Sequence, residues 1–395
     1  MSEGMDRRLD QGVFGNVSRR GLLHAGLAAG AVGWADLSAD VAHAATGEKT
    51  DVINVHPDGT YDTVALKKDR ISLSVIQCRV RPPDDANNAE PTIKENLDHM
   101  IDLIDTAMSL SPPKDLVFFH EFPLTGFRSE WTKEEALKVA REFPGPETEA
   151  LGRKAKEYGF YLVFGSYVRD PDWPNHLLSL TAIISPEGEL IDKHWKARNI
   201  KGVFGGGTIE LQTSTIFNVL DEYIERYGAD AVLPVTRTDI GNICTTSTQM
   251  EPEIVRALAI KGGEIILRTA SGGFSKLDMQ ASAAYNRVYV AVANNAHSPG
   301  LRGIFEDTGG GGCAIYGPRG EILAEAPNGL EQEISTSVPM AEFRRTHRQP
   351  VFHWELYKPV FDKYVGKYDP GLFSVYQPTS LQDAGRYLAD KSKWK

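Results

Sequence analysis

Three segments of this 395-residue sequence carry side chains suited to proton transfer, charge stabilisation and nucleophilic attack. The first runs from Asp115 to Phe122 and places Glu121 at the end of an apolar stretch. Ligands of open α/β sheets bind at the carboxyl ends of strands, where a partly desolvated carboxylate is suited to general base catalysis. The alternative interpretation is that Glu121 lies at the rim of the sheet and only forms an ion pair. Glu121 alone therefore does not determine the function.

The second segment runs from Gly188 to Lys196 and is predicted to be a hairpin strand that ends in a cation. An ammonium group beside a reacting carbonyl stabilises the oxyanion that forms there. Because lysines are common at protein surfaces, the alternative interpretation of Lys196 is a solvated side chain.

The third segment, Ile240 to Glu253, runs from a strand through a turn into a helix and contains Cys244. A thiol near a helix N-terminus has a lowered pKa, which makes Cys244 a candidate nucleophile. The alternative is a buried structural cysteine. Cys78 and Cys313 lie inside predicted strands and are interpreted as core residues.

The elements that must position these side chains interleave along the chain, which predicts an α/β fold without a dividing linker. The predicted strands are Ile71–Val80, Leu116–Phe122, Phe160–Val168, Leu177–Ile184, Glu189–Trp195, Ala231–Val235, Ile240–Thr245, Glu264–Thr269, Val288–Asn294, Cys313–Tyr316 and Glu321–Glu325. The predicted helices are Pro91–Leu110, Glu147–Tyr158, Ser214–Tyr227, Glu251–Lys261 and Met279–Arg287.

Composition narrows the class of protein. A content of 41% hydrophobic and 24% charged residues is ordinary for a soluble globular protein. The net charge of −10 argues against a partner that is nucleic acid. Three cysteines are too few for a disulfide scaffold.

Residues 1–44 are predicted to be a twin-arginine-type export signal. Arg19 and Arg20 precede a short Ala/Gly/Leu run, and Ala42-His43-Ala44 fits a small-residue cleavage site. The run is shorter than the roughly 20 residues that a membrane-spanning helix needs. We therefore expect a mature chain that starts near Ala45 and is periplasmic or secreted, without membrane contact. A disordered leader and an uncleaved anchor are the alternatives.

For the remaining chain the sequence predicts an N-terminal extension (45–69), one domain (70–339) and an aromatic-rich C-terminal arm (340–395). The arm lacks strand alternation. It either packs on its own domain or wraps over a second copy of the chain.

Together, in the order Glu, Lys, Cys, the three segments resemble the carbon–nitrogen hydrolase (nitrilase-like) superfamily from about residue 70 to 340. "DLVFFHEFPLTGF" resembles the glutamate strand of that family, "GELIDKHWK" its lysine hairpin, and "PEIVRALAIKGGEIILRTASG" the helix and strand after its cysteine. "NRVYVAVANNA" and "GPRGEILAEA" resemble its later strands, and the aliphatic amidases and formamidases are the most similar members. The resemblance implies a four-layer αββα sandwich that forms a homodimer or a larger homo-oligomer.

The resemblance also implies a reaction: hydrolysis of a small amide, nitrile or carbamoyl compound through a thioester, without a metal or organic cofactor. Glu121 is the implied general base, Lys196 the implied oxyanion stabiliser and Cys244 the implied nucleophile. Thr246 and His297, which follows Asn294-Asn295 at a strand end, are predicted to contact the substrate.

The turn after Cys244 departs from the family. Members of the family carry the nucleophile six residues before the Pro-Glu of the next helix, whereas Cys244 lies eight residues before Pro252. An alignment without a gap therefore places Thr246 at the nucleophile position. Two extended residues span about 6–7 Å. Cys244 on a longer turn, a hydroxyl such as that of Thr246, and a non-catalytic protein that binds a ligand or assembles therefore remain alternatives. The second glutamate of many members is replaced by Phe204, with Glu210 the nearest candidate.

Overall fold

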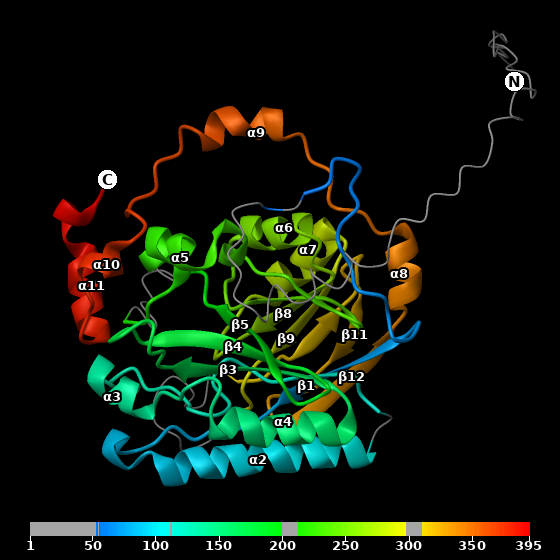
Figure 1. The fold of residues 1–395 in the computed structure, drawn as a ribbon, viewed down its shortest axis with the longest axis horizontal. Helices are drawn as coiled ribbons and strands as arrows, with labels where there is room; N and C mark the ends of the chain where they lie inside the picture. The colour runs from blue at the N-terminus through cyan, green and yellow to red at the C-terminus, as the bar shows by residue number, and fades with distance from the viewer. Residues whose placement is uncertain (1–52, 54, 111–112, 200–211, 298–309) are drawn as a thin grey trace, which may run out of the picture. The chain divides into compact units, whose positions relative to one another are not determined.

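A computed structural model describes residues 53, 55–110, 113–199, 212–297 and 310–395, and within them the chain forms two six-stranded sheets (Figure 1). The first sheet has the order β12 (Gln332–Val338), β1 (Ile71–Gln77), β2 (Leu116–Phe118), β3 (Tyr161–Val168), β4 (Leu178–Ile184) and β5 (Leu190–Trp195). The second has the order β11 (Ile322–Glu325), β10 (Ala314–Tyr316), β9 (Tyr289–Ala293), β8 (Ile265–Thr269), β7 (Gly241–Thr246) and β6 (Thr236–Thr238).

Helices cover the outer face of each sheet, as Figure 1 shows. Helices α2 (Glu90–Leu110) and α4 (Pro146–Tyr158) pack on the first sheet, and α6 (Pro252–Ile260) and α7 (Lys276–Asn286) pack on the second. One hydrophobic core lies under each helical layer and a third lies between the sheets. The predicted αββα sandwich is confirmed.

Parallel strands form the centre of each sheet. β1, β2 and β3 are parallel neighbours, as are β7, β8 and β9, and helices connect them. The carboxyl ends of β2, β7 and β8 lead directly to Glu121, Thr246 and Thr269. Since ligands bind at these ends in α/β sheets, the topology assigns the candidate chemistry to one edge of the sandwich.

Several elements differ from the predictions. Ala231–Val235 is not a strand: a 3-10 turn covers Ala229–Val232, and the short β6 follows Pro234. β12 was not predicted, because its half-exposed polar residues give a weak alternation, yet it pairs with β1 over its whole length. The predicted helix 214–227 begins as a 3-10 segment and becomes α5 only at Leu220 (Leu220–Tyr227).

The remaining helices are α3 (Lys133–Val139), α8 (Met340–Thr346), α9 (Trp354–Phe361), α10 (Leu372–Val375) and α11 (Leu381–Ala389). The C-terminal arm is partly self-packing, because α10 and α11 bury Leu372, Phe373, Ala384 and Leu388 in the core under α2. In contrast, α9 buries none of its residues. Among the described helices, none combines the length and the apolar character needed to cross a membrane.

Candidate active site

Glu121 and Lys196 meet, although 75 residues separate them in the sequence. Lys196 Nζ donates to Glu121 Oε1 over 3.0 Å, and the side chains are only 4% and 8% exposed. Lys196 follows β5 directly, and Glu121 lies three residues after β2. The structure therefore places the predicted base and the predicted oxyanion stabiliser side by side.

The backbone around Glu121 is fixed by both sheets. Its N–H donates to the carbonyl of Ala270, which follows β8 of the second sheet, over 3.4 Å. Its carbonyl passes so close to β3 that a Cβ on Gly165 would lie 2.3 Å away. Residue 165 must therefore be a glycine for the backbone of Glu121 to lie where it does. The neighbouring His120 is buried, which lowers its pKa to about 3 and keeps the ring neutral.

The structure places Cys244 in the layer beneath α6, and its role as the nucleophile stays a prediction. The thiol is fully buried among Leu258, Ala259 and Ile266. A Cβ on Gly263 would lie 2.6 Å from its sulfur. Cys244 lies beneath α6, two positions before the end of β7, and not at the N-terminus of that helix.

The electrostatics of Cys244 agree with that placement. Burial raises the pKa of the thiol to about 12, whereas the sequence predicted a lowered pKa. The charged groups with the largest effect on the pKa of Cys244 are Lys261, Arg237, Glu264 and Asp192. The other two cysteines of the sequence are also fully buried, Cys78 under α2 and Cys313 between the sheets.

Thr246 occupies the end of the strand. It is the last residue of β7 and pairs with Arg268 of β8. Its Oγ1 accepts a hydrogen bond from the N–H of Thr248 over 3.0 Å, in the turn toward α6. Because the N–H of Glu121 donates to the carbonyl of Ala270, just beyond the end of β8 that pairs with Thr246, Thr246 and Glu121 lie at the same edge of the sandwich. The gapless spacing had predicted this position for the nucleophile.

The backbone of His297 lies beside the turn between β11 and β12. The N–H of His297 donates to the carbonyl of Gly329, between β11 and β12, over 2.6 Å. Its contact with substrate stays a prediction. Phe204 and Glu210 lie outside the described residues.

Sequence reasoning missed two charged residues and one polar network around the site. Arg198 forms an ion pair with Glu251 and donates to the carbonyl of Gln249, so it ties the segment after Lys196 to the start of α6. Arg268 stands inside the apolar run Ile265–Thr269. A cation within a buried strand was the signal that could have identified it.

The missed network joins the two strands that carry Lys196 and Thr246. His194 Nδ1 lies 3.0 Å from Thr245 Oγ1, and His194 Nε2 lies 3.1 Å from Asp192 Oδ2. His194 belongs to β5 and Thr245 to β7, so the network fixes one strand against the other. It thereby sets the separation of the two functional positions next to it.

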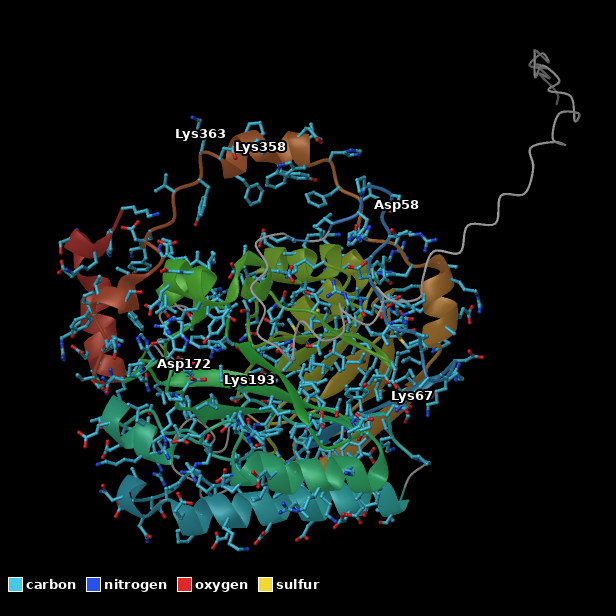
Figure 2. All side chains as sticks on the ribbon, viewed as in Figure 1. Asp58, Lys67, Asp172, Lys193, Lys358 and Lys363 are labelled. Carbon is cyan, nitrogen blue, oxygen red and sulfur yellow. The ribbon has the colours of Figure 1, made fainter. Side chains whose placement is uncertain are left out.

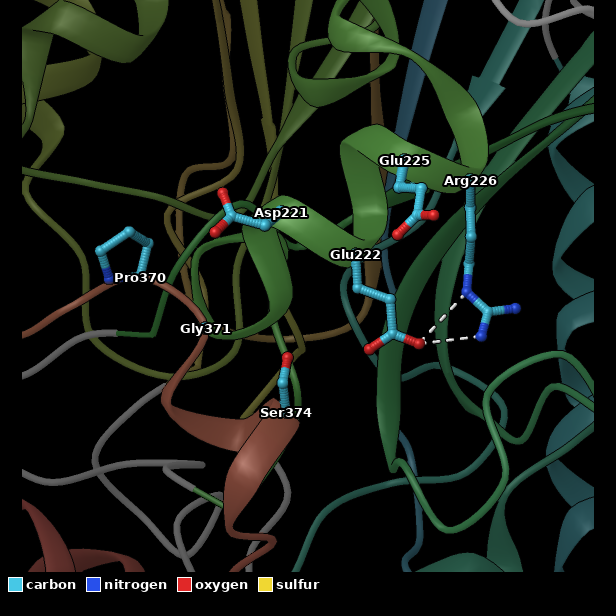
Figure 3. Close-up of a pocket in the computed structure, with 7 residues that line it drawn as sticks. All are labelled: Asp221, Glu222, Glu225, Arg226, Pro370, Gly371 and Ser374. Carbon is cyan, nitrogen blue, oxygen red and sulfur yellow. Dashed lines mark hydrogen bonds and ion pairs between the residues drawn. The ribbon is translucent and has the colours of Figure 1, made fainter.

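Figure 3 shows a pocket elsewhere on the molecule, between α5 and the start of α10. It is lined by Asp221, Glu222, Glu225, Arg226, Pro370, Gly371 and Ser374. Arg226 forms an ion pair with Glu222 over 2.8 Å, one helical turn away, and none of the predicted site residues lines this pocket. The described residues contain no group of three His, Cys, Asp or Glu side chains that could hold a metal ion.

Comparison with known proteins identifies the family and the fold of the chain. A family model described as carbon-nitrogen hydrolase matches residues 73–348. A formamidase of Bacillus cereus (strain B4264) is 28% identical over 225 residues, which cover 54% of this chain and 59% of the formamidase. A formamidase of Bacillus thuringiensis (strain Al Hakam) matches with the same figures. The chain thus matches less than two thirds of the length of these relatives.

Solved structures show the likeness of fold. A double mutant of the amidase from Nesterenkonia sp. AN1 in complex with acrylamide superposes with a TM-score of 0.54 at 17% identity, covering 75% of this chain and 99% of the amidase. A single mutant of that amidase, with the acetamide moiety of fluoroacetamide added covalently at its active-site cysteine, gives a TM-score of 0.53 with the same identity and coverage.

Proposed function

The chain belongs to the carbon–nitrogen hydrolase family, and from that premise we propose that it hydrolyses the carbon–nitrogen bond of a small amide at Glu121 and Lys196. The observation that carries this proposal is the 3.0 Å contact between these two buried charges at the strand ends. Removing two charges from water costs several kcal/mol per ion, so a buried pair at a ligand-binding edge points to chemistry. The formamidase relatives support an amide as the substrate.

Thr246 supplies the nucleophile in place of a thiol. Glu121 accepts the proton of Oγ1 while Oγ1 bonds to the carbonyl carbon, and the ammonium group of Lys196 stabilises the oxyanion. Glu121 then gives this proton to the amide nitrogen, the carbon–nitrogen bond breaks and ammonia leaves. A hydroxyl is far less acidic than a thiol, so this step requires the adjacent carboxylate.

Water completes the cycle by attacking the ester on Thr246. Glu121 accepts a proton from the water and returns it to Oγ1 as the carboxylic acid departs. Position supports this role, because Thr246 ends β7 at the edge that Glu121 and Lys196 occupy.

Ammonia release from short amides tests the function. We expect the purified chain to convert formamide, acetamide or propionamide into equimolar ammonia and acid. A folded protein that releases no ammonia from any amide would overturn hydrolysis.

One observation favours a second function, ligand binding without turnover: all three thiols of the sequence are buried, and Cys244 packs beneath α6. In that case amides would raise the thermal unfolding temperature while no ammonia forms. Measuring both quantities on the same preparation separates the two functions.

Export is a further part of the proposal. Arg19 and Arg20 ahead of a short apolar run, with Ala42-His43-Ala44 beyond it, support a twin-arginine signal and a periplasmic or secreted mature protein. These residues lie outside the described part of the chain.

The arm supports a homo-oligomer. Segment 351–365 exposes nine large hydrophobic side chains by 37% to 88%: Val351, Phe352, Trp354, Leu356, Tyr357, Val360, Phe361, Tyr364 and Val365. Figure 2 shows Lys358 and Lys363 of this segment standing away from the two sheets. An apolar surface of this extent is typical of a contact between proteins, and we assign it to a second copy of the chain.

We expect the wild-type chain to be a dimer or larger by light scattering, and the double variant Trp354→Glu/Phe361→Glu to shift toward the monomer. Leu110→Glu is the matched control, because Leu110 is 79% exposed at the end of α2, outside the arm. A monomeric wild type would contradict the assignment.

A further inference from the structure

Arg268 is a buried cation in the middle of the second sheet. It lies on β8, between β7 and β9, and is 3% exposed. Three consecutive apolar residues, Ile265–Leu267, precede it on the strand. Nothing about the packing of an inner strand calls for a guanidinium group at this position.

No carboxylate of the described residues pairs with this charge by direct contact. Within the described part of the chain, Nε and Nη1 of Arg268 are buried and have no hydrogen-bond partner. The charged groups that act on it are Glu121, Asp278 and Arg198, which come from three different elements. Its guanidinium therefore lies among the end of β2, the start of α7 and the segment after β5.

Those neighbouring charges are already engaged. Glu121 accepts from Lys196, and Arg198 is paired with Glu251. Asp278 accepts from the N–H of Met250 over 2.7 Å. Burial lowers the pKa of Arg268 to about 10, so the side chain is still positively charged at neutral pH. An unpaired buried charge is strongly unfavourable, which indicates an absent anionic partner.

Buried hydroxyls surround the same strand ends. The oxygens of four side chains that follow or end β7 and β8 also lack a hydrogen-bond partner among the described residues: Ser247, Thr248, Thr269 and Ser271. Each buried polar atom left unsatisfied costs about 1–3 kcal/mol. Their position beside a group that only donates hydrogen bonds points to a ligand with acceptor oxygens.

We propose that Arg268 and these hydroxyls bind a carboxylate group of the substrate, so that the protein acts on a short amide that also carries a carboxylate. This inference rests on the proposed function and names its substrate class. Guanidinium groups bind carboxylates through two parallel hydrogen bonds, so Arg268 also orients the amide toward Lys196 and Thr246.

Two substrates of equal length test the proposal: succinamate, which carries a carboxylate, and the neutral diamide succinamide. A charge-assisted hydrogen bond contributes enough binding free energy for a preference of roughly 10- to 100-fold. We expect kcat/KM of the wild type to favour succinamate by that factor. In Arg268→Gln the ratio of the two values falls toward 1. The control Arg256→Gln removes a guanidinium group of α6 that donates to the carbonyl of Tyr285 on α7, and it keeps the wild-type ratio.

Calorimetric titration with succinate provides a readout that needs no turnover. Saturable succinate binding to the wild type, absent in Arg268→Gln, supports the anion site even if no amide is hydrolysed, in which case the proposed function alone fails. Hydrolysis of both substrates at equal kcat/KM, with no succinate binding, overturns the carboxylate site and leaves the function in place. If Arg268→Gln does not fold, the wild-type ratio and the succinate titration still decide.

Discussion

Glu121→Gln lowers kcat for ammonia release by roughly 100- to 10,000-fold, the range that a positioned general acid–base contributes. The substituted amide side chain fills the same space as the carboxylate, but it cannot accept the proton of the attacking hydroxyl. Lys196→Met lowers kcat by roughly 100- to 1,000-fold, because the oxyanion then loses its buried cation. Steady-state ammonia release at saturating amide measures both effects.

Matched controls lie close by. Lys193 lies on β5, which ends one residue before Lys196, but its ammonium group binds Asp170 over 3.2 Å and the carbonyl of Phe143. Lys193→Met is therefore expected to keep full activity. Glu142 is an exposed partner of Arg169, so Glu142→Gln is the control for Glu121→Gln. Activity within a few-fold of wild type in Glu121→Gln would contradict the proposed chemistry.

Stability must be measured beside activity, because Glu121 and Lys196 neutralise one another. Removing Lys196 alone takes the ammonium group away from the buried Glu121 carboxylate, and breaking a buried ion pair in this way costs about 3–5 kcal/mol. The double variant Glu121→Gln/Lys196→Met removes this carboxylate as well. It should therefore unfold at a higher denaturant concentration than Lys196→Met while remaining inactive. If the pair were purely structural, activity would return together with stability. Low activity despite restored stability therefore indicates a role in the chemistry.

Much of the fold was predictable because its elements carry local signals. Helix α4 begins at Pro146 and ends before Gly159, whose φ of 72° suits glycine. The hairpin of β4 and β5 turns at Pro186-Glu187-Gly188, and a period-two pattern marks β1. Strand β12 was missed because it is held by long-range pairing with β1, and its polar residues give no clear strand pattern in the sequence.

The site was predictable in part for the same reason. Glu121 and Lys196 each end a recognisable strand, so the topology was enough to bring them together. The depth of Cys244 could not be predicted, because the depth of a side chain along a strand depends on where the strand ends. The structure continues β7 to Thr246, two residues beyond the thiol. Arg268 was missed because its significance depends on which of its neighbours are already paired.

The position of β7 leads to the second large prediction: Thr246→Ala abolishes turnover, whereas Cys244→Ala does not. Loss of a nucleophile leaves only binding and oxyanion stabilisation, so kcat should fall by at least about 1,000-fold. Cys244→Ala should keep kcat within a few-fold, because the thiol contacts the helical layer and not Glu121. Cys244→Ala should instead lower the free energy of unfolding by about 1 kcal/mol, because it leaves a small cavity under α6.

Two further variants distinguish the hydroxyl from its surroundings. Thr246→Ser keeps an oxygen nucleophile and should retain activity, whereas Thr246→Val keeps the shape and should be inactive. Intact-mass analysis during turnover should detect the acyl group on wild-type protein and on Cys244→Ala, but not on Thr246→Val. An acyl group that disappears in Cys244→Ala would return the thiol to the mechanism. Activity retained in Thr246→Val but lost in Glu121→Gln would mean that Glu121 activates water directly, because a carboxylate that can deprotonate a hydroxyl can also deprotonate water.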